Sequence, residues 1–114
     1  MERSEGLQVL RYGAGTEFKP HHDYFDPQQR GSDVWLKRGG QRIGSLVIYL
    51  NTPRNGGATI FPESGLNVFP QRGCAVFFSY PTPTPDTRTL HGGAPVIRGE
   101  KWVATKWLRA EAFE

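Results

Sequence analysis

The chain has 114 residues, of which 37% are hydrophobic and 22% charged, and its formal net charge at pH 7 is +3. This length predicts one domain over residues 1–114. The 14 glycines and 9 prolines imply many turns and short strands, which favours an all-β fold. Lysine and arginine are spread along the chain and form no basic stripe, so we expect no nucleic-acid partner.

The cysteine content and the apolar runs bear on the compartment. Cys74 is the only cysteine, so no internal disulfide can form, and we expect its thiol to be buried within the apolar run 74–78. This cysteine usage favours a reducing compartment, and we expect a cytoplasmic protein. No apolar run approaches the length of a membrane span, and residues 1–5 lack the hydrophobic segment of a signal peptide, so we expect no membrane partner.

Alternating apolar and polar residues predict a series of strands with turn residues between them. The longer predicted strands cover residues 7–12, 42–50, 73–80 and 101–108, and the shorter ones cover residues 58–61, 67–69, 90–91 and 96–97. No segment shows a convincing helical stripe of apolar residues, and the long connection over residues 25–41 is expected to be mobile. About eight strands are typical of a jelly roll, so we predict a double-stranded β-helix.

The second predicted strand is apolar on both faces. Leu46 and Ile48 share one face, whereas Val47 and Tyr49 share the other, so both faces are expected to be buried. No predicted helix could cover the outer face. We therefore expect either upstream helices in a longer natural protein or a second copy of the chain, as in a homodimer, to cover it.

The most distinctive local motif is His21-His22-Asp23, because an imidazole and a carboxylate two residues apart lie on the same side of an extended segment. A third ligand is needed, and His91 is the histidine that remains. Two histidines and one carboxylate form a facial triad that suits non-haem Fe(II) oxygenases, because it leaves coordination positions open. His22 is the alternative to His21, but it would point away from Asp23, so we place it at the pocket rim or on the surface.

Several further motifs occur in a fixed order around this triad. They are Tyr12-Gly13, Lys19-Pro20-His21-His22-Asp23, Arg42-Ile43, the segments 56–62 and 73–78, Leu90-His91-Gly92, and Gly99-Glu100-Lys101-Trp102. In this combination, residues 7–108 resemble the catalytic domain of the prolyl 4-hydroxylases, which are Fe(II)- and 2-oxoglutarate-dependent dioxygenases. The resemblance covers nearly the whole chain.

The resemblance implies roles for residues outside the triad. Lys101 would form the salt bridge to the distal carboxylate of 2-oxoglutarate, and Tyr12 and Thr59 would donate hydroxyl hydrogen bonds to it. A buried carboxylate needs such partners, because an unpaired one is strongly disfavoured. Arg42 and Trp107 would help to hold the peptide substrate, and L-ascorbate would reduce the iron after uncoupled turnovers.

The implied reaction couples oxidative decarboxylation of 2-oxoglutarate by O₂ to hydroxylation of a C–H bond, with release of succinate and CO₂. Peptidyl proline is the substrate that the resemblance favours, in a peptide or protein. Other amino-acid side chains, small metabolites and alkylated bases are alternatives. Halogenation is disfavoured because halogenases of this kind lack the carboxylate ligand, whereas Asp23 is present.

A function of a different class is also compatible with these residues. The chain could be a non-enzymatic jelly roll that holds a metal structurally, or a truncated fragment that binds peptide without turnover. The predicted role of Lys101 separates the two classes, because a structural metal site has no need of a cation ten residues beyond its last ligand.

Overall fold

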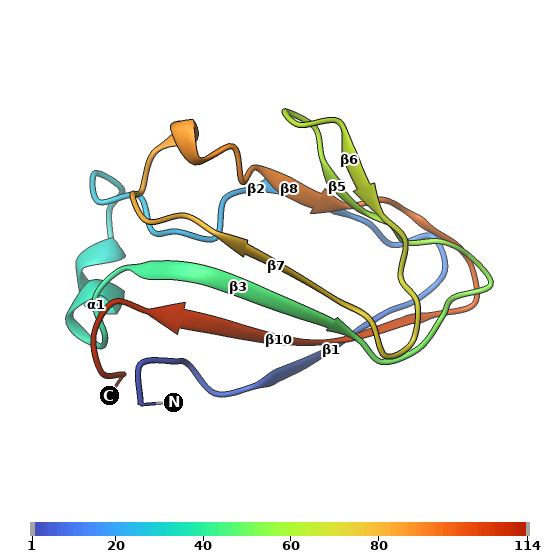
Figure 1. The fold of residues 1–114 in the computed structure, drawn as a ribbon, viewed down its shortest axis with the longest axis horizontal. Helices are drawn as coiled ribbons and strands as arrows, with labels where there is room; N and C mark the ends of the chain where they lie inside the picture. The colour runs from blue at the N-terminus through green and yellow to red at the C-terminus, as the bar shows by residue number, and fades with distance from the viewer. Residues whose placement is uncertain (1, 114) are drawn as a thin grey trace.

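A computed structural model describes residues 2–113 and shows a mainly antiparallel β structure (Figure 1). The elements in chain order are β1 (Gln8–Tyr12), β2 (Phe18–His21), α1 (Ser32–Lys37), β3 (Arg42–Tyr49), β4 (Asn55–Gly56), β5 (Thr59–Phe61), β6 (Leu66–Val68), β7 (Ala75–Ser79), the 3₁₀ helix η1 (Pro85–Thr87), β8 (His91–Gly93), β9 (Val96–Arg98) and β10 (Lys101–Arg109).

Two four-stranded sheets form the two layers of the fold (Figure 1). The major sheet has the strand order β1-β10-β3-β7, and the minor sheet has the order β2-β8-β5-β6. All neighbouring strands in both sheets are antiparallel. Strands far apart in sequence thus lie side by side, and the predicted double-stranded β-helix, or jelly roll, is confirmed.

Strand register places the candidate site residues in pairs. In the major sheet Tyr12 is the cross-strand partner of Lys101, and in the minor sheet His21 is the partner of His91. Side chains of directly opposite residues lie on the same face of a sheet. Each pair therefore projects together toward the interior between the two sheets.

The most buried aromatic cluster lies beside the candidate metal ligand His91. Phe61 of the minor sheet packs edge-on against Phe78 of the major sheet, with ring centroids 5.2 Å apart, and Tyr80 joins this cluster. The Phe78 ring lies 4.5 Å from the imidazole of His91. The core that joins the two sheets thus also supports one of the three candidate ligands.

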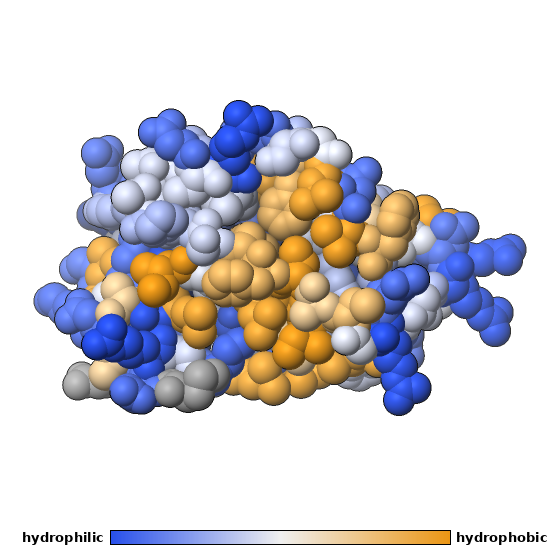
Figure 2. Space-filling model, viewed as in Figure 1, coloured by the Kyte–Doolittle hydropathy of each residue, from blue (hydrophilic) through white to orange (hydrophobic). Residues whose placement is uncertain are grey.

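The outer face of the major sheet is partly exposed. Figure 2 shows apolar residues gathered over the middle of the molecule, where β3, β7 and β10 cross the view. Leu46 and Ile48 are half-buried, and Phe77 and Trp102 have exposed fractions of 56% and 36%. The prediction that both faces of β3 are buried is therefore wrong for the outer face, because no element among residues 2–113 fully covers it.

Four elements differ from the sequence prediction, one of them the 3₁₀ helix η1. Strand β2 was not predicted because Pro20 and two other exposed residues obscure its alternation, and β4 is only two residues long. Helix α1 lies within the connection 25–41, where no helical stripe was recognised, because six residues are too few to establish a helical period.

The environment of Cys74 contradicts the prediction of a buried thiol. Cys74 is exposed. Cys74 lies one residue before β7 begins, and its sulfur is 3.9 Å from the side-chain oxygen of Gln71. The alternation of inward and outward side chains in β7 therefore does not apply to Cys74. Among the helices that the structure describes, none has the length and apolar character needed to cross a membrane.

Candidate active site

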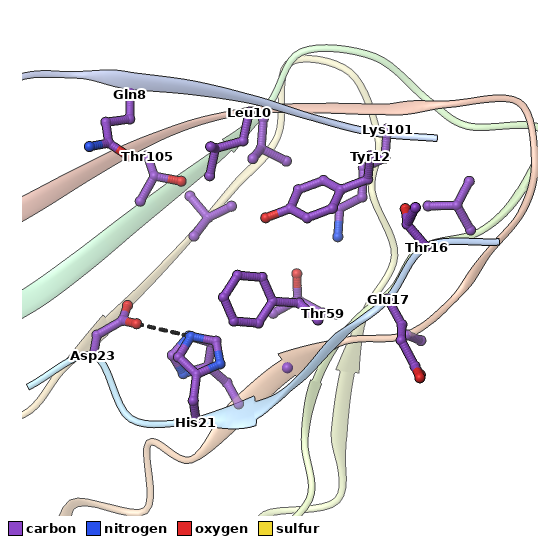
Figure 3. Close-up of a pocket in the computed structure, with 18 of the residues that line it drawn as sticks. Gln8, Leu10, Tyr12, Thr16, Glu17, His21, Asp23, Thr59, Lys101 and Thr105 are labelled. Carbon is purple, nitrogen blue, oxygen red and sulfur yellow. Dashed lines mark ion pairs between the residues drawn. The ribbon is translucent and has the colours of Figure 1, made fainter. Parts of the chain in front are cut away.

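The predicted triad residues come together at one point between the sheets. His21, Asp23 and His91 each offer one ligand atom, and these atoms lie within 4.8 Å of one another. Asp23 Oδ1 is 3.2 Å from His21 Nε2 and 3.5 Å from His91 Nε2 (Figure 3). His21 ends β2, His91 begins β8, and Asp23 follows in the bend after β2. The three donors are therefore held by the pairing of two neighbouring strands.

Backbone contacts fix the orientation of both imidazoles. His21 Nδ1 lies 2.9 Å from the carbonyl oxygen of Lys19, and His91 Nδ1 lies 2.8 Å from that of Thr89. A carbonyl oxygen can only accept, so each Nδ1 carries the proton and each Nε2 is left with its lone pair in the neutral ring. Such second contacts are typical of metal-ligating histidines.

The two oxygens of Asp23 have different partners. Oδ1 faces the imidazoles, whereas Oδ2 accepts hydrogen bonds from Ser45 Oγ at 2.6 Å and from Trp107 Nε1 at 3.1 Å. Burial would raise the pKa of this carboxyl group, but the contacts with His21, His91 and Ser45 outweigh burial and hold the pKa far below its usual value.

The donor set is therefore suited to a cation. Asp23 Oδ1 and, in the neutral rings, the two imidazole Nε2 atoms each offer a lone pair toward a shared centre, so a proton or a metal cation must lie between them. Because Oδ2 is already occupied by two donors, Asp23 can offer Oδ1 alone. Two imidazoles and one monodentate carboxylate fit the ligand set of a non-haem Fe(II) centre with open positions.

A cavity of about 370 Å³ leads from this donor set into the space between the sheets. Lys101 lies on the opposite side of it from His21 and Asp23 (Figure 3). The lysine is only 6% exposed, and burial lowers the pKa of its ammonium group to about 8. No carboxylate of residues 2–113 is paired with it. The cavity thus offers a buried cation without an anionic partner.

Aromatic and hydroxyl side chains surround this lysine. Lys101 Nζ is 5.5 Å from the ring centroid of Tyr12 and 5.9 Å from that of Tyr49. Tyr49 Oη is 2.7 Å from Thr59 Oγ1, and both Tyr12 and Thr59 line the cavity. Burial raises the pKa of Tyr12, helped by the charge of Asp23, so its hydroxyl stays protonated and can donate.

Gly57 makes room for the lysine stem. Its φ angle is +81°, a left-handed conformation that L side chains rarely adopt, and a Cβ there would lie 3.2 Å from Lys101 Cδ. The glycine of the predicted motif therefore has a packing role beside the cation.

Arg42 and Trp107 line the same cavity near the triad. The guanidinium carbon of Arg42 lies 4.3 Å from the ring centroid of Trp107. His22 also lines the cavity, is half-buried, and stacks on Tyr24 with ring centroids 4.7 Å apart. Its Nε2 is buried and has no hydrogen-bond partner within the described chain.

Sequence reasoning missed several residues that shape the site. Ser45 anchors Asp23, Tyr49 anchors Thr59, and Glu5 anchors Arg42. Trp107 was predicted as a substrate contact, but its hydrogen bond to Asp23 was not predicted. None of these contacts is local, since Glu5 and Arg42 are 37 residues apart. The available signal was the inward position of Ser45 in a strand whose other inward residues are apolar or aromatic.

The chain is similar in sequence to a known family and to known proteins. Residues 7–109 match the 2OG-Fe(II) oxygenase superfamily. Prolyl 4-hydroxylase 1 of Arabidopsis thaliana is 41% identical over an alignment 127 residues long, gaps included, that covers 97% of this chain and 43% of that protein. The chain spans a little under half the length of the curated relatives it matches.

Solved structures agree in fold. A viral collagen prolyl hydroxylase from Paramecium Bursaria Chlorella virus-1, solved as a 2OG complex, has a TM-score of 0.77 and 33% identity over 94% of this chain and 59% of that one. A Pseudomonas putida prolyl-4-hydroxylase has a TM-score of 0.64 and 28% identity over 90% of this chain and 51% of that one. With its jelly roll and its His-Asp-His donor set, the chain belongs to the 2OG-Fe(II) oxygenase superfamily.

Proposed function

We propose that this protein is an Fe(II)- and 2-oxoglutarate-dependent dioxygenase that hydroxylates prolyl residues of a peptide or protein. One observation carries the proposal: a single cavity joins the His-Asp-His donor set to a buried lysine that lacks an anionic partner in the described chain. A structural metal site would need the donors but not the lysine. A dicarboxylate co-substrate that reaches from the metal to a cation needs both.

His21, Asp23 and His91 would hold the iron. When bound, the iron would supply the activation of O₂ that couples decarboxylation of 2-oxoglutarate to hydroxylation of a C–H bond, with succinate and CO₂ as products. The residues of this chain fix the donor atoms through strand pairing and backbone hydrogen bonds. Donor atoms that are already in place do not have to move during the reaction, which lowers its free-energy barrier.

Lys101 would bind the distal carboxylate of 2-oxoglutarate, with Tyr12 and Thr59 donating hydroxyl hydrogen bonds. A charge-assisted contact in a buried place is strong and directional, so it would orient the co-substrate along the cavity. The walls between the sheets would keep water from the reacting end. The buried position of Lys101 supports this role.

Arg42 and Trp107 are proposed to lie on the substrate side of the centre. They line the cavity and both contact Asp23, so a peptide that approaches the metal could reach them. The prolyl 4-hydroxylase names of the relatives support a proline-containing substrate. L-ascorbate is proposed as the reductant that restores the iron after turnovers without substrate.

Succinate formation tests the proposal. The protein would be incubated with Fe(II), ascorbate, O₂ and 2-oxoglutarate, with and without a proline-rich peptide, and with a His91→Ala variant as control. We expect peptide-stimulated succinate and a peptide heavier by one oxygen atom on proline. Succinate without any peptide dependence would keep the enzyme class and reject the prolyl substrate. No succinate above the His91→Ala level would favour a non-enzymatic metal-binding module.

A further inference from the structure

The contacts of Asp23 continue outward into two series of side chains, the first mostly buried and the second half-buried. The first runs from Asp23 Oδ2 to Ser45 Oγ at 2.6 Å and from there to Tyr80 Oη at 2.6 Å. Ser45 and Tyr80 are both 0% exposed. Because Ser45 has one hydroxyl proton and donates it to the carboxylate, Tyr80 must donate to Ser45. Both hydrogen bonds of this series therefore point the same way, from Tyr80 through Ser45 to Asp23 Oδ2.

The second series starts at the indole of Trp107, whose Nε1 donates to the same oxygen. Arg42 lies against this indole at 4.3 Å and also over the ring of Phe25 at 4.7 Å. Arg42 Nη1 donates to the backbone oxygen of Asp23 at 3.3 Å. Arg42 thus touches both the residue that bears the carboxylate and the indole that binds it.

Glu5 fixes the position of Arg42. Its carboxylate accepts from Arg42 Nε at 2.6 Å and from Nη2 at 2.9 Å, a bidentate pair, and it also accepts from Arg109 Nη1 at 3.1 Å. The side chains of Glu5 and Arg42 are only 12% and 18% exposed. Burial would raise the pKa of Glu5, but the two arginines outweigh burial and lower it, so the carboxylate stays charged.

Most N–H donors of Arg42 are therefore already engaged within the protein. A guanidinium held in this way is better placed to fix its neighbours than to reach freely for a peptide. We infer that Trp107 and Ser45 are positioning residues that hold the Asp23 carboxylate with Oδ1 toward the imidazoles, and that Glu5 acts on this carboxylate through Arg42 and Trp107. The inference rests on the proposed function, because it assumes a metal at the triad.

Removal of either donor would leave Oδ2 with one hydrogen bond and let the carboxylate turn more easily about its terminal torsion. Contacts of this kind around metal ligands commonly contribute about 10–100-fold to metal affinity. Trp107→Phe is the sharpest change, since it removes the N–H and keeps an aromatic ring against Arg42. Trp102→Phe is its matched control, because Trp102 is on the same strand but on the outer face.

The experiment measures Co(II) affinity by calorimetry and the visible spectrum of the Co(II)-loaded protein, without co-substrate. We expect Trp107→Phe and Ser45→Ala each to weaken Co(II) binding about 10–100-fold and to change the spectrum. Glu5→Gln should act in the same direction by a smaller factor, and Trp102→Phe should match the wild type. Circular dichroism checks that each variant folds. If Trp107→Phe does not fold, the Co(II) affinities of Ser45→Ala and Glu5→Gln test the inference.

Peptide kinetics separate positioning from substrate contact. Wild-type Co(II) affinity in Trp107→Phe together with a raised KM for peptide would overturn the inference and assign Trp107 to the substrate. An equal loss in Trp102→Phe would also overturn it, because the effect would not depend on Oδ2. If wild-type protein binds Co(II) no better than His91→Ala, the proposed function itself fails, and this result is distinct from the other two.

Discussion

Lys101 combines a formal charge with a buried position at the far end of the cavity. Its exposed fraction is 6%, and burial lowers its pKa to about 8. An ammonium group in such a place destabilises the fold relative to an apolar side chain, unless an anion joins it. A lysine of this kind is better explained by ligand binding than by stability.

The pKa of Lys101 predicts how 2-oxoglutarate binding depends on pH. Below about pH 8 the ammonium is protonated and attracts the carboxylate, and above it the amine is neutral. We expect affinity to fall by up to about tenfold per pH unit once the pH exceeds this value. Titration of the Co(II)-loaded protein at a series of pH values measures it. A Lys101→Arg variant keeps its charge at these pH values, so its 2-oxoglutarate affinity should no longer fall with pH. If its affinity falls as steeply as in the wild type, a group other than Lys101 causes the pH dependence.

Replacement of Lys101 by methionine should separate stability from binding. We expect Lys101→Met to raise the free energy of unfolding by about 1–3 kcal/mol at neutral pH, because the folded state no longer buries a cation. Co(II) affinity should stay near that of the wild type, while 2-oxoglutarate binding is lost. Denaturant unfolding and calorimetry measure the two effects. Lys37→Met, on the exposed side of α1, is the control, and an equal gain there would contradict the argument.

The site residues that sequence reasoning could find are those with a local motif. His21 and Asp23 are two residues apart, and Lys101 lies in a run that resembles a known family. Ser45 and Tyr80 carry no such signal, because their contacts with Asp23 and with each other span 22 and 35 residues. Only the register of the strands brings these residues together, and no short segment of the sequence predicts that register.

At the level of elements, the close pairing of β2 with β8 sets the distance between His21 and His91. Gly92 permits this pairing, because a Cβ there would lie 2.6 Å from the backbone oxygen of Phe18 and 2.9 Å from the nitrogen of Pro20. Both neighbours are backbone atoms, so they cannot move aside without moving the strand. The glycine beside the third ligand is therefore required by strand spacing.

Gly92→Ala should accordingly harm both stability and metal binding. We expect the free energy of unfolding to fall by about 1–3 kcal/mol, which is typical of overpacking, and Co(II) affinity to fall as β2 shifts from β8. Thermal unfolding and calorimetry check the two effects. Gly6→Ala is the matched control, since nothing lies within 4 Å of its added Cβ. A Gly92→Ala protein with wild-type metal affinity would contradict this account of the strand pairing.

The long strands were predictable because their apolar alternation extends over five or more residues. β3 and β10 begin at the predicted residues and end within one residue of the predicted ends. Strands β2 and β4 were not, because four residues with a proline and two residues with a glycine offer no period to detect. These short strands are held by partners distant in sequence, so tertiary pairing and not local propensity forms them.

At the level of the whole molecule, the outer face of the major sheet remains open in the described chain. Val9, Phe77 and Trp102 are exposed by 56%, 56% and 36%. Large exposed apolar patches commonly mark interaction surfaces or promote association. The patch lies on the side of the sheet that faces away from the cavity, so a covering partner would leave the metal site accessible.

We expect the isolated chain to self-associate through this face. Sedimentation velocity over a range of concentrations should show a dimer or larger species, and Trp102→Glu should shift the population toward monomer because it places a charge within the patch. Glu63→Gln, in the exposed turn between β5 and β6, serves as the control. If the chain is monomeric at every concentration, the homodimer is rejected. Upstream helices would then be the expected cover of the outer face of the major sheet.

The two ends of the described chain lie side by side (Figure 1). Phe113 N donates to Glu2 O at 2.8 Å, and Arg109 N donates to Arg3 O at 2.6 Å. A short linker could therefore close the chain into a ring, and new ends could be opened in the exposed turn at residues 62–65. In such a circular permutant His91 would come before His21 and Asp23. The order of the ligands along the polypeptide depends on where the ring is cut, whereas their geometry depends on the two sheets.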